Sequence, residues 1–148
     1  PGCAVGEPRT GYRGERWFPL VLQNIHRYFL YFAVAFLFIL SYDAIIATRF
    51  AAAGGGTEFG IGVGTLVLTL NVVLLGGYTL GCHSMRHLLG GIKDVLSNKP
   101  VRRKAYLCTS ALNRAHMRFA WASLVWVGFS DLYVRLCSMG VWTDFRLL

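Results

Sequence analysis

The sequence is poor in charged residues, and poorest in acidic ones. Only 7 of its 148 residues are Asp or Glu, against 15 Lys or Arg, while 55% are hydrophobic and the mean hydropathy is +0.48. Residues 28–46 contain one charged side chain, Asp43, and residues 61–80 contain Asn71 as their one strongly polar side chain. A soluble domain does not normally carry such runs. Each has the roughly 20 residues that a helix needs to cross about 30 Å of bilayer hydrocarbon, so both predict spanning helices.

Cysteine motifs and internal repeats are also absent. The four cysteines show no Cys-x-x-Cys pair and no regular series of spacings, which argues against a disulfide framework. The residues given contain no internal repeat and no low-complexity segment, and we expect no secretory signal peptide among them. Because it begins at Pro1 rather than Met, we expect further sequence upstream.

Residues 105–136 form a third long segment, and they include four charged side chains and one histidine: Arg114, His116, Arg118, Asp131 and Arg135. Their best apolar stretch, 119–129, is too short to cross alone. We interpret the segment as a spanning helix whose cytoplasmic third faces protein, with an amphipathic surface helix as the alternative. The sequence therefore predicts an all-α transmembrane helical bundle. It forms a single membrane domain over 1–148, with spans at about 19–48, 61–89 and 105–137.

The excess of basic residues is placed at particular ends of these helices. Lys and Arg mark cytoplasmic loops, so residues 1–16 and 91–104 are predicted inside. The loop 49–60, with a flexible stretch at 51–56, and the C-terminus are predicted outside. The net charge of +8 is thus a topology signal and does not indicate nucleic-acid binding. We expect a multi-pass protein of the bacterial plasma membrane, with Asp131 and Arg135, four residues apart, as an ion pair near its outer face.

The string from Gly81 to His87 places a cysteine, two histidines and an arginine at the end of the second apolar run. At about 1.5 Å per residue, the predicted topology brings all four histidines, from three helices, into or near the cytoplasmic half. Helical bundles build metal and haem sites from His and Cys side chains that lie at one depth on different helices. Taken singly, each histidine has a plainer interpretation as a hydrogen-bonded structural residue, and each cysteine as a small apolar one. The candidates are His26, His83, His87, His116, Cys82 and Cys108; Cys137 lies on the opposite side.

The same string resembles the Arg-His-Leu helix end of the cytochrome b anchor subunits of succinate dehydrogenase and fumarate reductase. With residues 7–14, 22–28, 59–64 and 112–117, the chain is closer to the membrane subunit of the actinobacterial-type succinate dehydrogenase, part of respiratory complex II. That family resembles a five-helix protein, so two helices would lie upstream or on another chain. The resemblance implies that the chain anchors a flavoprotein subunit and an iron–sulfur subunit and passes electrons from succinate to a quinone. It implies a hetero-oligomer, which could be a trimer of complexes.

The resemblance also bears on the cofactor. Haem-binding anchors have a histidine seven residues before the Arg-His histidine, and here that position is Leu80. The actinobacterial-type family is instead associated with a membrane-embedded Rieske-type [2Fe–2S] cluster, which needs two thiolates and two imidazoles. We expect the ligands to come from Cys82 first, then His83 and His116, with His26 as an alternative imidazole and Cys108 or Cys3 as the second thiolate. Haem b held by His26 with His83 or His116 is a second hypothesis.

Quinone reduction needs hydrogen-bond donors for developing charge and an apolar slot for the ring. Arg86 and His87 have that chemistry, and Trp17, Tyr28 and Trp121 are candidate slot walls, although interfacial aromatic residues are often only anchors. The basic 91–104 loop would dock the soluble subunits or contact anionic lipid headgroups. A third hypothesis is a non-redox helical assembly or transport protein whose histidines are structural.

Overall fold

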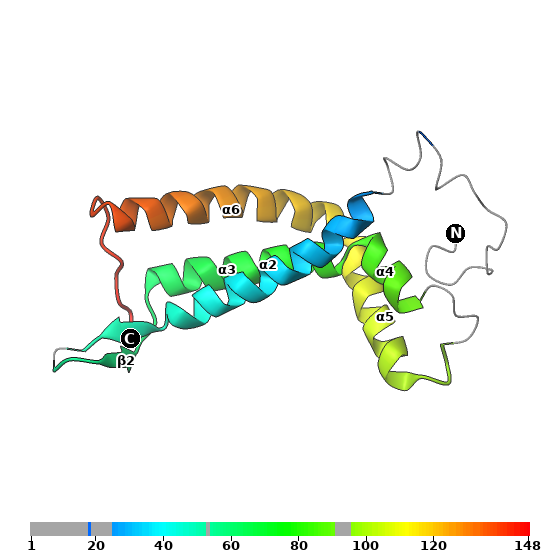
Figure 1. The fold of residues 1–148 in the computed structure, drawn as a ribbon, viewed down its shortest axis with the longest axis horizontal. Coiled ribbons are helices and arrows are strands. Elements are labelled where there is room, and N and C mark those ends of the chain that lie inside the picture. Colours follow the sequence, from blue (N-terminus) through cyan, green and yellow to red (C-terminus); the bar gives the residue numbers. More distant parts are fainter. Residues whose placement is uncertain (1–17, 19–24, 53, 91–95) are drawn as a thin grey trace. The chain divides into compact units, whose positions relative to one another are not determined.

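The computed structural model describes residues 18, 25–52, 54–90 and 96–148, and it divides into two compact units. The first unit comprises residues 1–35 and 77–117, and the second comprises 36–76 and 118–148. The elements in chain order are α2 (His26–Ile46), β1 (Arg49–Ala51), β2 (Thr57–Phe59), α3 (Val63–Leu80), α4 (His83–Gly90), α5 (Pro100–Arg114) and α6 (His116–Ser138) (Figure 1). The predicted all-α fold is confirmed, with a small β-hairpin added.

Two of the described helices are long and apolar enough to cross a membrane, over Arg27–Ile46 and Val63–Leu80. They correspond to the first two predicted spans; residues 19–24 of the first lie outside the described residues. The 23 residues of α6 are also long enough to cross. Because α6 carries Arg118, Asp131 and Arg135, it is less apolar than the other two.

The second predicted helix, 61–89, is two helices in the structure. In a continuous helix the Met85 N–H would bond to the carbonyl of Gly81. It bonds instead to Cys82, at 3.1 Å, and the Gly81 carbonyl accepts a hydrogen bond from the Asn113 side chain at 2.8 Å. A Cβ at position 81 would lie 3.1 Å from Leu112, so glycine allows this close approach. The interruption between α3 and α4 therefore comes from a contact with α5.

The third predicted helix, 105–137, is also interrupted. α5 ends at Arg114, and the Ala115 N–H bonds to the Leu112 carbonyl at 3.0 Å, a tighter turn than an α-helix makes. α6 begins at the next residue, His116. Neither Gly nor Pro lies at this break, so the sequence contains no local signal for it.

The predicted flexible loop at 51–56 forms, in its described part, a β-hairpin. β1 and β2 are antiparallel, with Phe50 opposite Glu58, and Gly55 and Gly56 take positive φ at the turn. The C-terminal segment then pairs with the residues leading into α3. The Val63 N–H donates to the Phe145 carbonyl at 2.9 Å, and the Leu147 N–H donates to the Ile61 carbonyl at 2.7 Å.

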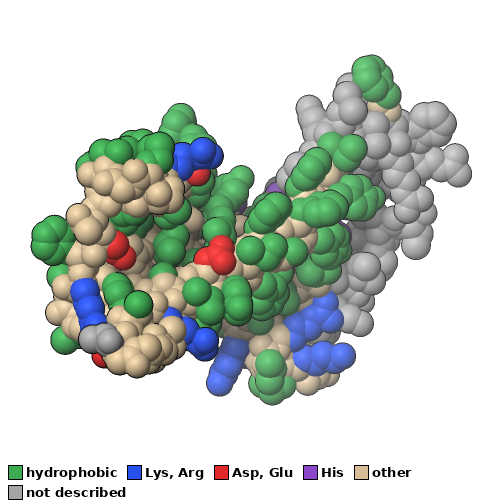
Figure 2. Space-filling view, turned by 60° about the vertical axis from the view of Figure 1, so that its left-hand side comes forward, with side chains coloured by type: hydrophobic (Ala, Val, Ile, Leu, Met, Phe, Trp, Pro, Cys, Tyr) green, Lys and Arg blue, Asp and Glu red, His purple; other side chains and the backbone are tan. Residues whose placement is uncertain are grey.

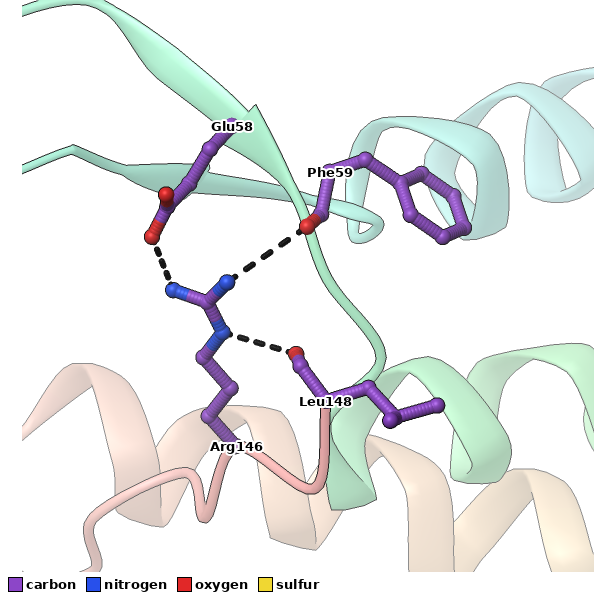
Figure 3. A network of polar contacts seen from close by, with 4 residues as sticks. All are labelled: Glu58, Phe59, Arg146 and Leu148. Carbon is purple, nitrogen blue, oxygen red and sulfur yellow. Dashed lines mark hydrogen bonds and ion pairs between the residues drawn. The ribbon is translucent and has the colours of Figure 1, made fainter.

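Side chains reinforce this pairing in the second unit. Asp144 accepts hydrogen bonds from the Gly64 N–H at 2.7 Å and the Tyr133 hydroxyl at 2.9 Å. Figure 3 shows Arg146 bound to Glu58 and to the carbonyls of Phe59 and Leu148. The hairpin and the C-terminal segment therefore lie together in the second unit.

The polarity of interior and surface is the reverse of a soluble protein's. The buried set among the described residues is mostly hydroxyl or amide: Thr65, Asn71, Thr79, Ser84, Thr109, Ser123 and Ser130, with Leu30, Val67 and Tyr133 as its apolar members. Hydrophobic side chains cover much of the face seen in Figure 2. Small polar residues between helices and apolar residues outside are typical of a bundle in lipid. The predicted Asp131–Arg135 ion pair is confirmed, at 2.8 Å.

Candidate functional site

A cavity of about 170 Å³ lies between the start of α2 and one face of α4, within the first unit. It exists because the chain turns at Gly81 and Cys82, so that α4 starts afresh at His83. Residues four apart on a helix share a face, which brings His83 and His87 to the same wall. The full lining is Arg27, Tyr28, Leu30 and Tyr31 from α2 and His83, Ser84, His87 and Leu88 from α4.

Ser84 is the most enclosed polar group in this cavity. The residue is only 8% exposed, and its hydroxyl oxygen has no hydrogen-bond partner among the described residues. A buried hydroxyl without a partner is costly, by about 1–3 kcal/mol. A ligand with a hydrogen-bonding oxygen or nitrogen would remove that cost, so the cavity suits a molecule that is apolar over most of its surface and polar at one atom.

Arg86 lies on the side of α4 that packs against α5. Its guanidinium donates to the Asn113 side-chain oxygen at 3.2 Å and to the Tyr106 hydroxyl at 3.1 Å. The same Asn113 donates to the Gly81 carbonyl. Arg86 therefore ties α4 to α5 and does not line the cavity with His87. Its Nε is buried and unpaired among the described residues.

His116, at the start of α6, stacks on Tyr78 near the end of α3. The ring centroids are 4.7 Å apart and the planes differ by 18°. The Nδ1 of His116 is buried and has no partner in the described part of the chain. A buried, unpaired imidazole nitrogen of this kind can bind a metal ion or form a hydrogen bond with a buried water molecule.

The other predicted site residues are more dispersed. Cys82 is half-buried at the turn before α4, and Cys108 is exposed on α5. Trp121 is 64% exposed on α6, in the second unit. His26 is the first residue of α2, but its side chain lies outside the described residues, as do Trp17 and Cys3.

Metal binding can be tested on these positions. Among the residues that the structure describes, no three His, Cys, Asp or Glu side chains come close enough to hold a metal ion. The described Cys82, Cys108, His83 and His116 thus do not by themselves form the two-thiolate, two-imidazole set of a Rieske-type cluster. Among the described residues, the His116 ring has a buried nitrogen without a hydrogen-bond partner, as a metal ligand would need.

Besides the aliphatic Leu30 and Leu88, three lining residues were not assigned to a site from the sequence: Ser84, Tyr31 and Arg27. The signal that could have found Ser84 is its place in the string, one residue after His83 and three before His87, on the same helical face. Tyr31 follows Tyr28 by three residues and Arg27 by four, which are helical spacings, so the choice of Tyr28 could have been extended to them.

The chain is similar to known proteins in both sequence and structure. Residues 1–140 match the family described as "Actinobacterial succinate dehydrogenase subunit SdhC". The structure is similar to a chain of the solved "Mycobacterium smegmatis Sdh1 complex in the apo form", with a TM-score of 0.76 and 46% sequence identity. That similarity covers 99% of this chain and 53% of the solved chain, so the present chain spans about half the length of its relative. No curated protein matches the chain.

Proposed function

The chain belongs to the actinobacterial succinate dehydrogenase SdhC family, and on that premise we propose that it is a membrane-anchor subunit of a bacterial succinate:quinone oxidoreductase. Its partners would be a flavoprotein subunit, where succinate is oxidised, and an iron–sulfur subunit. Its own part in the reaction would be to hold the quinone while electrons and protons reach it. The chain would lie in the plasma membrane as a multi-pass protein.

The observation that supports this role is the cavity between α2 and α4. Sites for whole drug-sized ligands run to about 300–1,000 Å³, so a cavity of about 170 Å³ admits a ring-sized head group and leaves an isoprenoid tail outside. Leu30 and Leu88 supply apolar wall, and Tyr28 and Tyr31 supply aromatic wall. Ser84 supplies a buried hydroxyl without a partner among the described residues, and in this proposal it donates to a quinone carbonyl.

The chemistry of the lining matches what quinone reduction demands. Two electrons and two protons are added to the carbonyl oxygens, so negative charge develops there before protons arrive. Donors aimed at those oxygens stabilise that charge. The exposed His87 can take a proton from water and pass it inward, because an imidazole both donates and accepts protons. Arg86, in turn, holds α4 against α5 and so fixes the wall that carries Ser84 and His87.

We also propose a redox cofactor in this subunit, a Rieske-type [2Fe–2S] cluster or, as the alternative, haem b. The unpaired buried Nδ1 of His116 supports one ligand. The remaining ligands would have to include groups beyond the described residues, His26 and Cys3 among them. Iron and acid-labile sulfide content with EPR would identify a cluster, and reduced-minus-oxidised optical bands would identify haem.

The experiment for the quinone site is Ser84→Ala in the intact complex, with Ser110→Ala as the matched control. Both changes remove a buried hydroxyl that has no described partner, but Ser110 lies on α5 and does not line the cavity. Succinate-driven reduction of quinone should fall up to about tenfold for Ser84→Ala, the size of one neutral hydrogen bond. Reduction of a water-soluble dye by the soluble subunits should stay unchanged. Equal quinone kinetics for the two variants would rule out the assignment of Ser84.

A further inference from the structure

A second hollow lies between the end of α4 and the start of α5, again within the first unit. This α4–α5 groove has a volume of about 560 Å³ and is lined by Leu88, Leu89, Lys99, Pro100, Val101, Arg102 and Ala105. Apart from Lys99 and Arg102, its walls are aliphatic. The volume lies in the range of ligand sites. The quinone proposal does not use this groove.

The groove is held in shape by a charged hydrogen bond across it. Arg102, in the first turn of α5, donates to the carbonyls of Leu88, at 3.2 Å, and Leu89 near the end of α4. Those carbonyls have no partner within a helix that ends at Gly90, and a cation at a helix C-terminus is favourable. Pro100 begins α5 where a missing N–H costs nothing. The two walls are therefore fixed relative to each other.

The rim of the groove is strongly basic. Lys99, Arg102, Arg103 and Lys104 fall within six residues. The described residues of the first unit include no Asp or Glu at all. Arg103 and Lys104 are exposed, and no described acidic side chain of the first unit balances their charge.

Apolar side chains are exposed beside these cations. Val101 is 82% exposed and Leu107 54% exposed on α5, next to Arg103 and Lys104. An exposed apolar surface bordered by Lys and Arg is the pattern of a helix at a membrane interface, and basic pockets at the cytoplasmic ends of spanning helices bind anionic lipid headgroups. A protein partner is the weaker fit, because lysine is depleted in protein–protein interfaces.

We propose that the α4–α5 groove binds one anionic phospholipid, with an acyl chain against Leu88, Leu89 and Ala105 and the phosphate beside Lys99 and Arg103. The acyl chain covers the aliphatic walls, and the phosphate places a negative charge beside the basic rim. Of the two occupants that the sequence left open for this basic region, soluble subunits or lipid headgroups, the groove favours lipid. The inference requires a membrane-embedded chain and is independent of the quinone site.

The test uses the full chain, purified with the subunits that accompany it and placed in nanodiscs of phosphatidylcholine with added phosphatidylglycerol. Native mass spectrometry counts the phosphatidylglycerol retained. Ala105→Trp fills the groove and should abolish retention, whereas Ala111→Trp, at an exposed position of α5 outside the groove, should not. The double change Lys99→Gln and Arg103→Gln should weaken retention about 25-fold, fivefold per charge, while Arg114→Gln leaves it unchanged.

Each alternative occupant has its own result. Retention that is the same in Ala105→Trp as in the parent would overturn the proposal. So would competition by inorganic phosphate as strong as that by phosphatidylglycerol, which would indicate an anion site with no place for a chain. Loss of the soluble subunits from the Lys99→Gln and Arg103→Gln variant, with phosphatidylglycerol retained, would instead make the groove a protein interface. The retained lipid is counted in the absence of quinone, so the result does not depend on the quinone proposal and the two proposals can fail separately.

Discussion

The two units of the protein differ in how many of their described polar groups have partners. In the second unit the described residues include four Arg and four Asp or Glu, and three of its acids have identified partners: Glu58 with Arg146, Asp131 with Arg135, and Asp144 with Tyr133 and Gly64. In the first unit they include seven Lys or Arg and no acid. One described side-chain atom, of Asn71, is buried and unpaired in the second unit; in the first the unpaired atoms belong to Thr79, Ser84, Arg86, Ser110 and His116.

This difference indicates a division of labour. Buried polar groups without partners are expensive and persist mainly where a ligand, water or cofactor completes them. The first unit contains both the cavity with Ser84 and the α4–α5 groove, so its incomplete groups lie in the region proposed to bind quinone and lipid. In the second unit three of the four described acids have partners, and we expect this unit to serve as scaffold. Variants in the second unit should therefore change stability and leave quinone kinetics alone, while variants of the cavity-lining residues of the first unit should change quinone kinetics.

The largest effect is expected at Gly81, in the first unit. A Cβ there would lie 2.6 Å from the Gly77 carbonyl and 3.1 Å from Leu112, so Gly81→Ala should force α4 and α5 apart at a cost of about 1–3 kcal/mol. Because α4 carries the cavity wall, quinone reductase activity should fall as well. Gly128→Ala is the control, since nothing lies within 4 Å of a Cβ at that helical position. Thermal inactivation of the complex compares them, and equal midpoints would show that the close approach at Gly81 is not required.

The next largest effect is expected at Asp144, in the second unit. Asp144→Asn weakens two hydrogen bonds to a charged acceptor, from Gly64 and Tyr133, and should cost about 1–2 kcal/mol of stability. Asp131→Asn removes only an exposed ion pair four residues apart and should cost about 0.5 kcal/mol or less. Neither should change the KM for quinone. A raised KM in Asp144→Asn would mean that the second unit also takes part in the site.

Variants of Arg86 and His87 distinguish a structural role from a quinone-binding role within the first unit. Arg86→Lys loses the planar fork that binds Asn113 and Tyr106 and should cost about 1 kcal/mol of stability, with little change in the KM for quinone. His87→Gln should raise that KM about threefold to tenfold, because His87 lines the cavity. Steady-state kinetics with thermal midpoints on the same preparations separate the two. If the KM for quinone rises more in Arg86→Lys than in His87→Gln, Arg86 would belong to the quinone site, as the sequence predicted.

Long uninterrupted patterns were predictable from the sequence. The apolar runs 28–46 and 61–80 became α2 and α3, because hydrophobic length is a property of consecutive residues. The Asp131–Arg135 pair was predictable for the same reason, since helical spacing alone brings the two side chains together. Family membership followed from several separated strings, and it is confirmed.

The breaks within helices were not predictable, because their causes are distant in the chain. The turn at Gly81 depends on Asn113, 32 residues later, which takes the Gly81 carbonyl out of the helical ladder. That turn decides which residues of α4 face the cavity and which face α5. The sequence therefore grouped Arg86 with His87 as neighbours, whereas the structure places them on different faces. Ser84 was overlooked because an isolated serine has no chemical signature until its burial is known.

The smallest effect is expected at Arg146 of the second unit, because its ion pair with Glu58 is exposed to solvent. Arg146 joins Glu58 of the hairpin to the C-terminal segment and also donates to the Leu148 carbonyl at 2.7 Å (Figure 3). Both partners of the ion pair are substantially exposed, so Arg146→Gln should cost about 0.2–1 kcal/mol, less at high salt. A double-mutant cycle with Glu58→Gln measures the pair itself. A coupling well above 1 kcal/mol that persists at high salt would show that the hairpin and the C-terminal segment exclude water in the membrane. The surrounding lipid would then strengthen the ion pairs of the second unit by excluding water from them.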